Sequence, residues 1–287
     1  MSVTVDTRGF KRAADVALAC VARDDTRPVL ACVSAETVDG HLRLAGADGF
    51  VCSYAEIPAK GRLSKLAPLA IGKPFKAALK GLKNGKVELS AAMRTVSFPE
   101  STATSYGGYS RAVTVKARTE EVAILSVNGA DLPCESGQFP DYRRITPSEW
   151  AYQAAVPVAW LMDAIGPKNG PGELRTWTFR AEGRAFTVRP GIIGGIDRFS
   201  TTTEHAYTGE PAVLPNAIET PPEAPVPVML NTTMTRRWLT ALAAAGCAAV
   251  LIMPTESERP VLFAAMGAGG MRIKILQMPT QIAGGTP

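Results

Sequence analysis

Residues 66–89 read LAPLAIGKPFKAALKGLKNGKVEL and contain, in order, an apolar run, a helical pattern, a turn and the start of a strand. The run 66–71 predicts a short strand, and 73–82 predicts an amphipathic helix because its apolar residues recur at helical spacing. Asn84-Gly85 is a strong turn signal, and β-type residues follow it. The stretch therefore predicts one strand-helix-meander module.

The same order of elements occurs four times along the chain, in modules of roughly 70 residues that share a pattern but not residue identities. The four helices are expected at 7–21, 73–82, 157–165 and 233–245. Two modules would make one domain, so we expect an α+β chain with domains at 1–140 and 141–287. The Pro-rich run 211–227 is interpreted as an extended crossover between modules three and four, or as a partner-binding segment.

The composition is that of an ordinary globular protein: 287 residues, 46% hydrophobic and 20% charged. No segment approaches the roughly 18 apolar residues that span a bilayer, and the start of the chain does not resemble a signal peptide. We therefore expect a cytoplasmic protein that does not enter a membrane. Five scattered cysteines without a CxxC pair and two isolated histidines predict buried thiols and no metal site or cofactor.

Positive charge is concentrated on three of the four predicted helices. The formal net charge is +5 and the pI is about 9.0. In the second helix, four lysines at spacings of three, four and three share one face, opposite an apolar stripe. The cations of the three basic helices are Arg8, Lys11, Arg12, Lys73, Lys76, Lys80, Lys83, Arg236 and Arg237. This pattern favours contacts to DNA phosphates without reading of bases, and the alternative is a solvated lysine surface.

Catalytic patterns are not found. Gly72-Lys73 is followed by proline, so it is not a phosphate-binding loop, and 267–270 is interpreted as a hairpin turn. Asp39, Asp48, Asp141 and Asp163 fall at turns and helix ends, where aspartate is common. No nucleophile, base and orienting group occur together in a motif. We expect a protein that is not an enzyme.

Three stretches resemble motifs of one family. Residues 138–147, QFPDYRRITP, closely resemble the FPDYRRVxP signature of the bacterial DNA sliding clamp, the β subunit of DNA polymerase III. Residues 39–49, DGHLRLAGADG, resemble that clamp's DGxLxLxATDG hairpin, and 276–279, LQMP, resemble its VVMP end. The resemblance covers nearly the whole chain. It implies a DNA-clamp fold, in which helices line the inner wall of a ring and strands form sheets outside.

The number of domains departs from the family. Bacterial clamps carry three domains per chain and close as dimers, whereas this sequence resembles only the second and third domains. A six-domain ring built from two-domain chains would be a homotrimer, although only a matching rotation per subunit closes such a ring. The short chain and its diverged motifs suggest a version from a phage or another mobile element.

The resemblance also implies a hydrophobic pocket, between the second and third domains, where polymerase and clamp loader dock short peptides. Carried over by motif, its residues are Gly49, Phe50, Val51, Cys52, Pro140, Arg144, Ile145, Leu276, Gln277, Met278, Pro279 and Thr280. Phe50 and Val51 replace the family's usual His-Arg, and Thr280 replaces a methionine. The chain also continues through 282–287, where such clamps normally end.

The resemblance and the basic helices together predict a processivity clamp that encircles duplex DNA and tethers polymerase. A rival hypothesis is a clamp-like adaptor or decoy that binds replication proteins without closing a ring. A nucleic-acid enzyme or nuclease accessory is a second rival. It would need a metal-binding carboxylate cluster, and none is located in the sequence.

Overall fold

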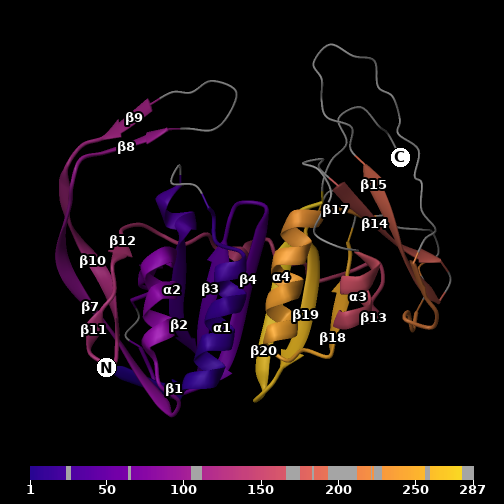
Figure 1. Ribbon diagram of the computed structural model, residues 1–287, viewed down its shortest axis with the longest axis horizontal. Coiled ribbons are helices and arrows are strands. Elements are labelled where there is room, and N and C mark those ends of the chain that lie inside the picture. Colours follow the sequence, from indigo (N-terminus) through magenta and orange to yellow (C-terminus); the bar gives the residue numbers. More distant parts are fainter. Residues whose placement is uncertain are drawn as a thin grey trace. The chain divides into compact units, whose positions relative to one another are not determined.

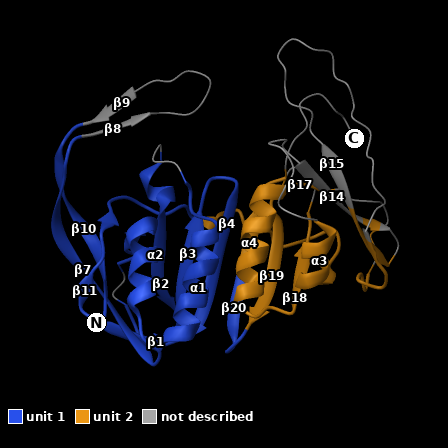
Figure 2. Cartoon of the chain, viewed as in Figure 1, with its two compact units in different colours: residues 1–141, 268–273 blue, residues 142–267, 274–287 orange. Residues whose placement is uncertain are grey.

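The computed structural model describes residues 1–23, 27–63, 66–104, 112–165, 175–182, 184–192, 212–220, 222, 228–255 and 259–279. The chain divides into two compact units, which Figure 2 shows in different colours. Unit 1 comprises Met1–Asp141 with Ala268–Ile273, and unit 2 comprises Tyr142–Gly267 with Lys274–Pro287. Which family domain each unit corresponds to stays a prediction.

Four helices confirm the helical periodicity of the sequence, with ends within two residues of those expected. They are α1 (Thr7–Ala19), α2 (Gly72–Gly81), α3 (Val158–Ala164) and α4 (Thr232–Ala244). The N-cap side chain of Asp6 accepts a hydrogen bond of 2.8 Å from the backbone of Gly9. Asn231 does the same for Met234 at 3.1 Å. Both caps satisfy a backbone donor that has no partner inside the helix, which explains where α1 and α4 begin.

Unit 1 contains two antiparallel sheets, with strand orders β11-β10-β7-β1-β5 and β12-β6-β2-β3-β4. A further two-stranded sheet joins β8 to β9. The strands are β1 (Ser2–Asp6), β2 (Cys32–Val38), β3 (His41–Ala47), β4 (Val51–Pro58), β5 (Lys60–Gly61), β6 (Leu69–Ile71), β7 (Lys86–Phe98), β8 (Ser101–Thr104), β9 (Ala112–Val115), β10 (Arg118–Val127), β11 (Ala130–Asp131) and β12 (Cys134–Glu135). Helices α1 and α2 lie side by side against the sheet that contains β2, β3 and β4 (Figure 1).

Unit 2 contains the strand orders β16-β15-β14-β17 and β13-β18-β19, and it includes the second half of β20, from Lys274 onwards. The strands are β13 (Ala154–Pro157), β14 (Arg175–Glu182), β15 (Ala185–Ile192), β16 (Ala212–Leu214), β17 (Val228–Asn231), β18 (Ala249–Met253), β19 (Val261–Gly267) and β20 (Met271–Gln277). Helix α3 contacts β13 and β18, and α4 contacts β14 and β17. Each unit therefore has two helices packed against its larger sheets, and unit 1 has the small β8-β9 sheet in addition.

The short strand before each helix is exchanged between the two modules of its unit. In unit 1, β1 pairs with β7 of the second module, and β6 pairs with β2 of the first. In unit 2, β13 pairs with β18 and β17 pairs with β14. A single module therefore lacks a strand of each sheet, so we infer that the two modules of a unit fold together.

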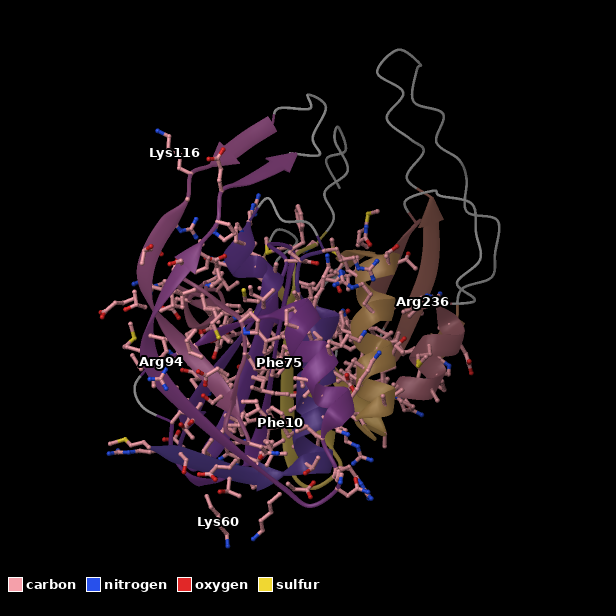
Figure 3. The ribbon with its side chains drawn as sticks, turned by 60° about the vertical axis from the view of Figure 1, so that its left-hand side comes forward. Phe10, Lys60, Phe75, Arg94, Lys116 and Arg236 are labelled. Atoms are coloured by element: carbon pink, nitrogen blue, oxygen red, sulfur yellow. The ribbon has the colours of Figure 1, made fainter. Side chains whose placement is uncertain are left out.

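Close contacts join the helices to each other and to their sheets. Phe10 of α1 and Phe75 of α2 are fully buried and meet edge to face, with ring centroids 6.0 Å apart; Figure 3 labels both. Gly46 lets α1 approach β3, because a Cβ there would collide with the carbonyl of Ala17. In unit 2, Trp238 of α4 packs on Phe263 at 4.6 Å. These contacts determine which face of each helix is buried and which face is left exposed to solvent.

One expectation about the strands needs correction. The Pro-rich run contains β16, whose residues 212–214 pair with β15, so this part is a sheet strand and not a free crossover. Strand β13 begins at Ala154, where its pairing with β18 begins. Residues 211, 221 and 223–227 of the run lie outside the described part of the chain.

The predicted turns are confirmed. Asp39 and Gly40 join β2 to β3 with φ of 47° and 74°, the left-handed conformations that a tight hairpin turn requires. Gly269 and Gly270, both at φ 75°, form the turn between β19 and β20, so this glycine-rich stretch is a hairpin turn.

Candidate nucleic-acid interface and peptide site

The four lysines of the second module all reach solvent. Lys73, Lys76 and Lys80 are exposed on α2, and Lys83 is exposed just beyond its end. The opposite face of the helix buries Phe75 and other apolar residues. The structure thus presents a concentrated positive surface, while its contact with DNA stays a prediction.

Helix α1 supplies three further cations, and one of them has an additional role. Arg8 is exposed, and Lys11 and Arg12 are half-buried. The Nζ of Lys11 donates a hydrogen bond of 2.7 Å to the carbonyl oxygen of Leu82, the C-cap residue of α2. The negative end of the α2 dipole favours a cation at this place. Lys11 therefore caps the neighbouring helix as well as contributing charge.

Arg236 of α4 repeats this arrangement in unit 2. Its Nη2 donates a hydrogen bond of 3.1 Å to the carbonyl oxygen of Ile165, the C-cap residue of α3. Lys11 and Arg236 are both the fifth residue of a 13-residue helix, and each bond spans 71 residues. Figure 3 labels Arg236, which is half-buried like its neighbour Arg237. The capping role was missed by the sequence reasoning, although the shared helix position was a usable signal.

Acidic side chains moderate the positive charge on these helices. Asp15 of α1 lies close enough to Lys76 and Lys11 for both to lower its pKa, but desolvation by partial burial outweighs them and raises the pKa above its ordinary value. The residue itself is exposed, so its side chain still reaches solvent. Helix α3 carries Asp163 and no cation, so three of the four helices are basic, as predicted.

In unit 1, the residues expected at the peptide site divide into exposed and buried ones. Gly49 and Phe50 are exposed in the turn before β4, whereas Val51 and Cys52 are buried at its start. Asp48 fixes this turn, because its Oδ1 accepts hydrogen bonds from the backbone of Phe50 at 3.0 Å and Val51 at 2.9 Å. Phe50 is 60% exposed and is the apolar side chain that unit 1 offers there. Pro140 is exposed in the coil of the signature motif.

In unit 2, the expected residues lie at two places. Arg144 ends a short 3-10 helix, η2 (Tyr142–Arg144), and Ile145 follows with half of its surface exposed. At the end of β20, Met278 is 37% exposed, whereas Leu276 and Gln277 are buried. Gln277 was expected at the surface of the peptide site. Its side chain instead accepts a hydrogen bond from Trp238 of α4. Pro279 is half-buried, and Thr280 with the residues after it lies outside the described part.

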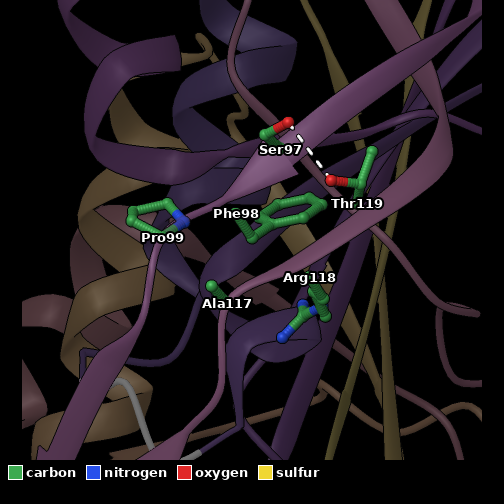
Figure 4. A pocket seen from close by; sticks show the side chains of 6 residues that line it. All are labelled: Ser97, Phe98, Pro99, Ala117, Arg118 and Thr119. Carbon is green, nitrogen blue, oxygen red and sulfur yellow. Dashed lines mark hydrogen bonds between the residues drawn. The ribbon is translucent and has the colours of Figure 1, made fainter.

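A surface pocket of about 370 Å³ lies where β7 and β10 pair, as Figure 4 shows. Its lining residues are Ser97, Phe98, Pro99, Ala117, Arg118 and Thr119. Arg118 stacks over the Phe98 ring at 4.6 Å and forms ion pairs with Glu120 at 3.1 Å and Glu135 at 2.8 Å. The charge of the pocket is thus balanced by the unit's own carboxylates, and no predicted site residue lines it.

The thiols are placed as expected for structural residues. All five cysteines are reduced and buried. Burial raises the pKa of Cys32 and of Cys52 to about 12, with a smaller contribution to Cys32 from the charge of Glu135. A thiol with so high a pKa holds its proton at neutral pH and is a poor nucleophile.

Two further findings concern other kinds of site. Across the described ranges, no three side chains among His, Cys, Asp and Glu are grouped so that they could hold a metal ion. Within the same ranges, none of the helices has the length and apolar character needed to cross a membrane.

No protein-family model and no curated protein matches this sequence. Solved structures of bacterial DNA polymerase III β subunits do match its fold. The one from Borrelia burgdorferi, in complex with a natural product, has a TM-score of 0.65 and 13% identity over 99% of this chain and 65% of its own. The structure from Pseudomonas aeruginosa has a TM-score of 0.63 and 16% identity over 98% of this chain and 67% of its own. The structure from Streptococcus pneumoniae has a TM-score of 0.64 and 12% identity over 98% of this chain and 65% of its own.

The chain thus spans about two thirds of the length of these β subunits. A second Pseudomonas aeruginosa structure, with a TM-score of 0.63 and 15% identity, is described as a DNA polymerase sliding clamp. At identities of 12–16%, the similarity concerns the fold. The chain has the fold of the bacterial DNA sliding clamp, as its signature motif predicted.

Proposed function

We propose that this protein is a DNA sliding clamp, a processivity factor that encircles duplex DNA without sequence preference. The observation that carries the proposal is the exposed lysine face of α2, which lies on a clamp fold beside the cations of α1. Lysines on helices neutralise phosphates but do not by themselves distinguish base sequences. The protein therefore acts as a topological tether and not as an enzyme.

The proposed assembly is a homotrimeric ring. The chain spans about two thirds of clamps whose structures it resembles, and a ring of six clamp domains needs three such chains. Head-to-tail association closes when the rotation per subunit is matched. The trimer would act in the cytoplasm at the replication fork, where polymerase and clamp loader would dock short peptides on the residues assigned to the peptide site.

Two measurements test the proposal together. Light scattering gives the molar mass, and a closed ring requires three times 30.3 kDa. After loading by a clamp loader, the protein should stay on nicked circular DNA at high salt and leave linear DNA by sliding off its ends, because the link is topological. Linearising the same plasmid is the control.

A monomer at micromolar concentration would contradict the ring. If the monomer still bound clamp-binding peptides, it would correspond instead to an adaptor or decoy for replication proteins. Equal retention on circular and linear DNA would contradict topological tethering even if the trimer formed.

A further inference from the structure

A buried polar cluster links the end of β20 to helix α4. The Oε1 of Gln277 accepts a hydrogen bond of 2.8 Å from Trp238 Nε1 and lies 3.1 Å from the hydroxyl of Thr235. Its Nε2 donates to the carbonyl of Asn231, the N-cap residue of α4, at 3.4 Å. Gln277, Trp238 and Thr235 are all fully buried. Both ends of the Gln277 amide are therefore used to hold α4.

The clamp fold does not itself require this cluster. When α1 and α4 are aligned on their N-caps, the positions of Thr235 and Trp238 correspond to Phe10 and Ala13, which are apolar and buried. At Gln277 itself, the VVMP pattern that the chain end resembles has a valine. A buried amide is stable only when its polar atoms find partners, so this chain has placed a directional contact where packing alone would suffice.

The position of Gln277 in the sequence gives the cluster a consequence for binding. The next residue is Met278, whose side chain is partly exposed, and Pro279 follows it. The same helix, α4, carries Arg236, which caps α3, and Arg237, which adds a second cation. Displacing the end of β20 would break bonds to Trp238 and Thr235, and an unsatisfied buried donor is costly.

We propose that Gln277 is a positioning residue that couples a peptide bound at Met278 and Pro279 to helix α4. The inference rests on the proposed function only for the identity of the ligand, a short hydrophobic clamp-binding peptide. Coupling of this kind is reciprocal. Binding of the peptide must therefore change the environment of the cluster on α4, and removing the hydrogen bonds of the cluster must weaken peptide binding.

The first test follows the indole N–H signal of Trp238 by ¹H–¹⁵N NMR in the full chain. The signal is assigned by its loss in Trp238→Phe, and the probe is a synthetic clamp-binding peptide of a bacterial replicative polymerase. We expect the signal to shift in proportion to peptide bound. The control variant Thr240→Val, which removes a hydroxyl bonded to Arg236 O on the exposed side of α4, should give the same shift.

The second test measures peptide affinity by fluorescence anisotropy. Gln277→Leu removes the bonds and leaves the indole N–H of Trp238 without its partner, whereas the Thr235 hydroxyl keeps a bond of 2.9 Å to the carbonyl oxygen of Asn231. The variant is therefore compared with the all-apolar combination Thr235→Val, Trp238→Phe and Gln277→Val. The combination makes these positions apolar, as the corresponding α1 positions are. It should remain folded and should bind the peptide about fivefold or more weakly. Its circular dichroism and thermal midpoint establish that folding is retained.

The outcomes separate this inference from the proposed function. If the parent chain binds the peptide but the Trp238 signal does not move, or if the apolar combination binds with the parent affinity, coupling through Gln277 is wrong and the peptide site stands. If the parent chain does not bind the peptide at all, the peptide site of the proposed function fails, and the inference fails with it.

Discussion

Lys11 of α1 donates a hydrogen bond of 2.7 Å to the backbone carbonyl of Leu82, the residue that caps the C-terminus of α2. Unit 2 places Arg236 against Ile165 in the same way, over the same sequence separation. In both units a cation of the longer helix thus stabilises the end of the shorter one. These two cations are structural whether or not they also contact phosphate.

Replacing Lys11 by methionine should lower the free energy of unfolding by about 1 kcal/mol, because the end of α2 loses both a hydrogen bond and a favourable charge. Lys11→Arg, which imitates Arg236, should retain most of the stability. Chemical denaturation measures both. Lys73→Met, at a solvent-exposed position of α2, is the matched control and should change the stability by less than about 0.5 kcal/mol.

Replacing all four lysines of the α2 face by alanine should weaken DNA binding without affecting folding or oligomer state, because their side chains are exposed. Each phosphate that the protein no longer neutralises should reduce the slope of log affinity against log salt by about 0.9 on duplex DNA. The variant carries Lys73→Ala, Lys76→Ala, Lys80→Ala and Lys83→Ala.

The control for this experiment removes the same charge from exposed cations on strands and their flanks. It carries Lys60→Ala, Lys86→Ala, Arg94→Ala and Lys116→Ala, three of which Figure 3 labels. This control should keep the parent salt slope. An equal reduction of the slope in both variants would mean that net charge, and not the α2 face, governs binding.

Asp15→Asn should stabilise the protein at neutral pH. The pKa of Asp15 is raised in the folded chain, mainly by desolvation, so the folded state binds the proton more tightly than the unfolded state. The free energy of unfolding therefore falls as pH rises through the interval above 3.8, and Asn removes this loss. The difference between variant and parent should be near zero at acid pH and positive at neutral pH.

Urea denaturation across that pH range measures this difference, with Asp163→Asn on α3 as the control for loss of one helix carboxylate. A difference that is independent of pH would show that desolvation of Asp15 does not influence stability.

Glu56→Gln should destabilise unit 1 by about 3 kcal/mol, because it leaves the nearly buried Arg43 without its closest charged partner. The Arg43 and Glu56 side chains are 12% and 10% exposed, and Arg272 also contacts Glu56 at 2.9 Å. Glu36→Gln removes the more exposed partner of Arg43 and should cost less than about 1 kcal/mol. Guanidinium denaturation compares the two, and equal losses would contradict the assignment of Glu56 as the principal partner.

Met278→Ala should weaken binding of a clamp-binding peptide by about 2 kcal/mol, roughly thirtyfold, if its side chain is a buried anchor of the complex. Met266→Ala, an equally conservative truncation of an exposed methionine in β19, should leave affinity unchanged. Titration of a labelled peptide measures both. Parent affinity in Met278→Ala would place the docking site elsewhere.

Much of the local structure was determined by the sequence itself. Periodicity located all four helices because their apolar residues must face a sheet every third or fourth position, and Asp39-Gly40 located a turn because only a few residues adopt positive φ at low cost. The signature at 138–147 was enough to indicate the fold. The solvent-facing position of the α2 lysines followed from helical spacing alone.

The tertiary structure decided which distant residues meet. Pairing of β1 with β7 and of β6 with β2 depends on the register of strands far apart in sequence, and helical or β periodicity carries no such information. The same holds for Lys11 with Leu82 and for Gln277 with Trp238. Gln277 looks like a surface residue by its type, and it is buried because α4 supplies partners for its amide across 39 residues of chain.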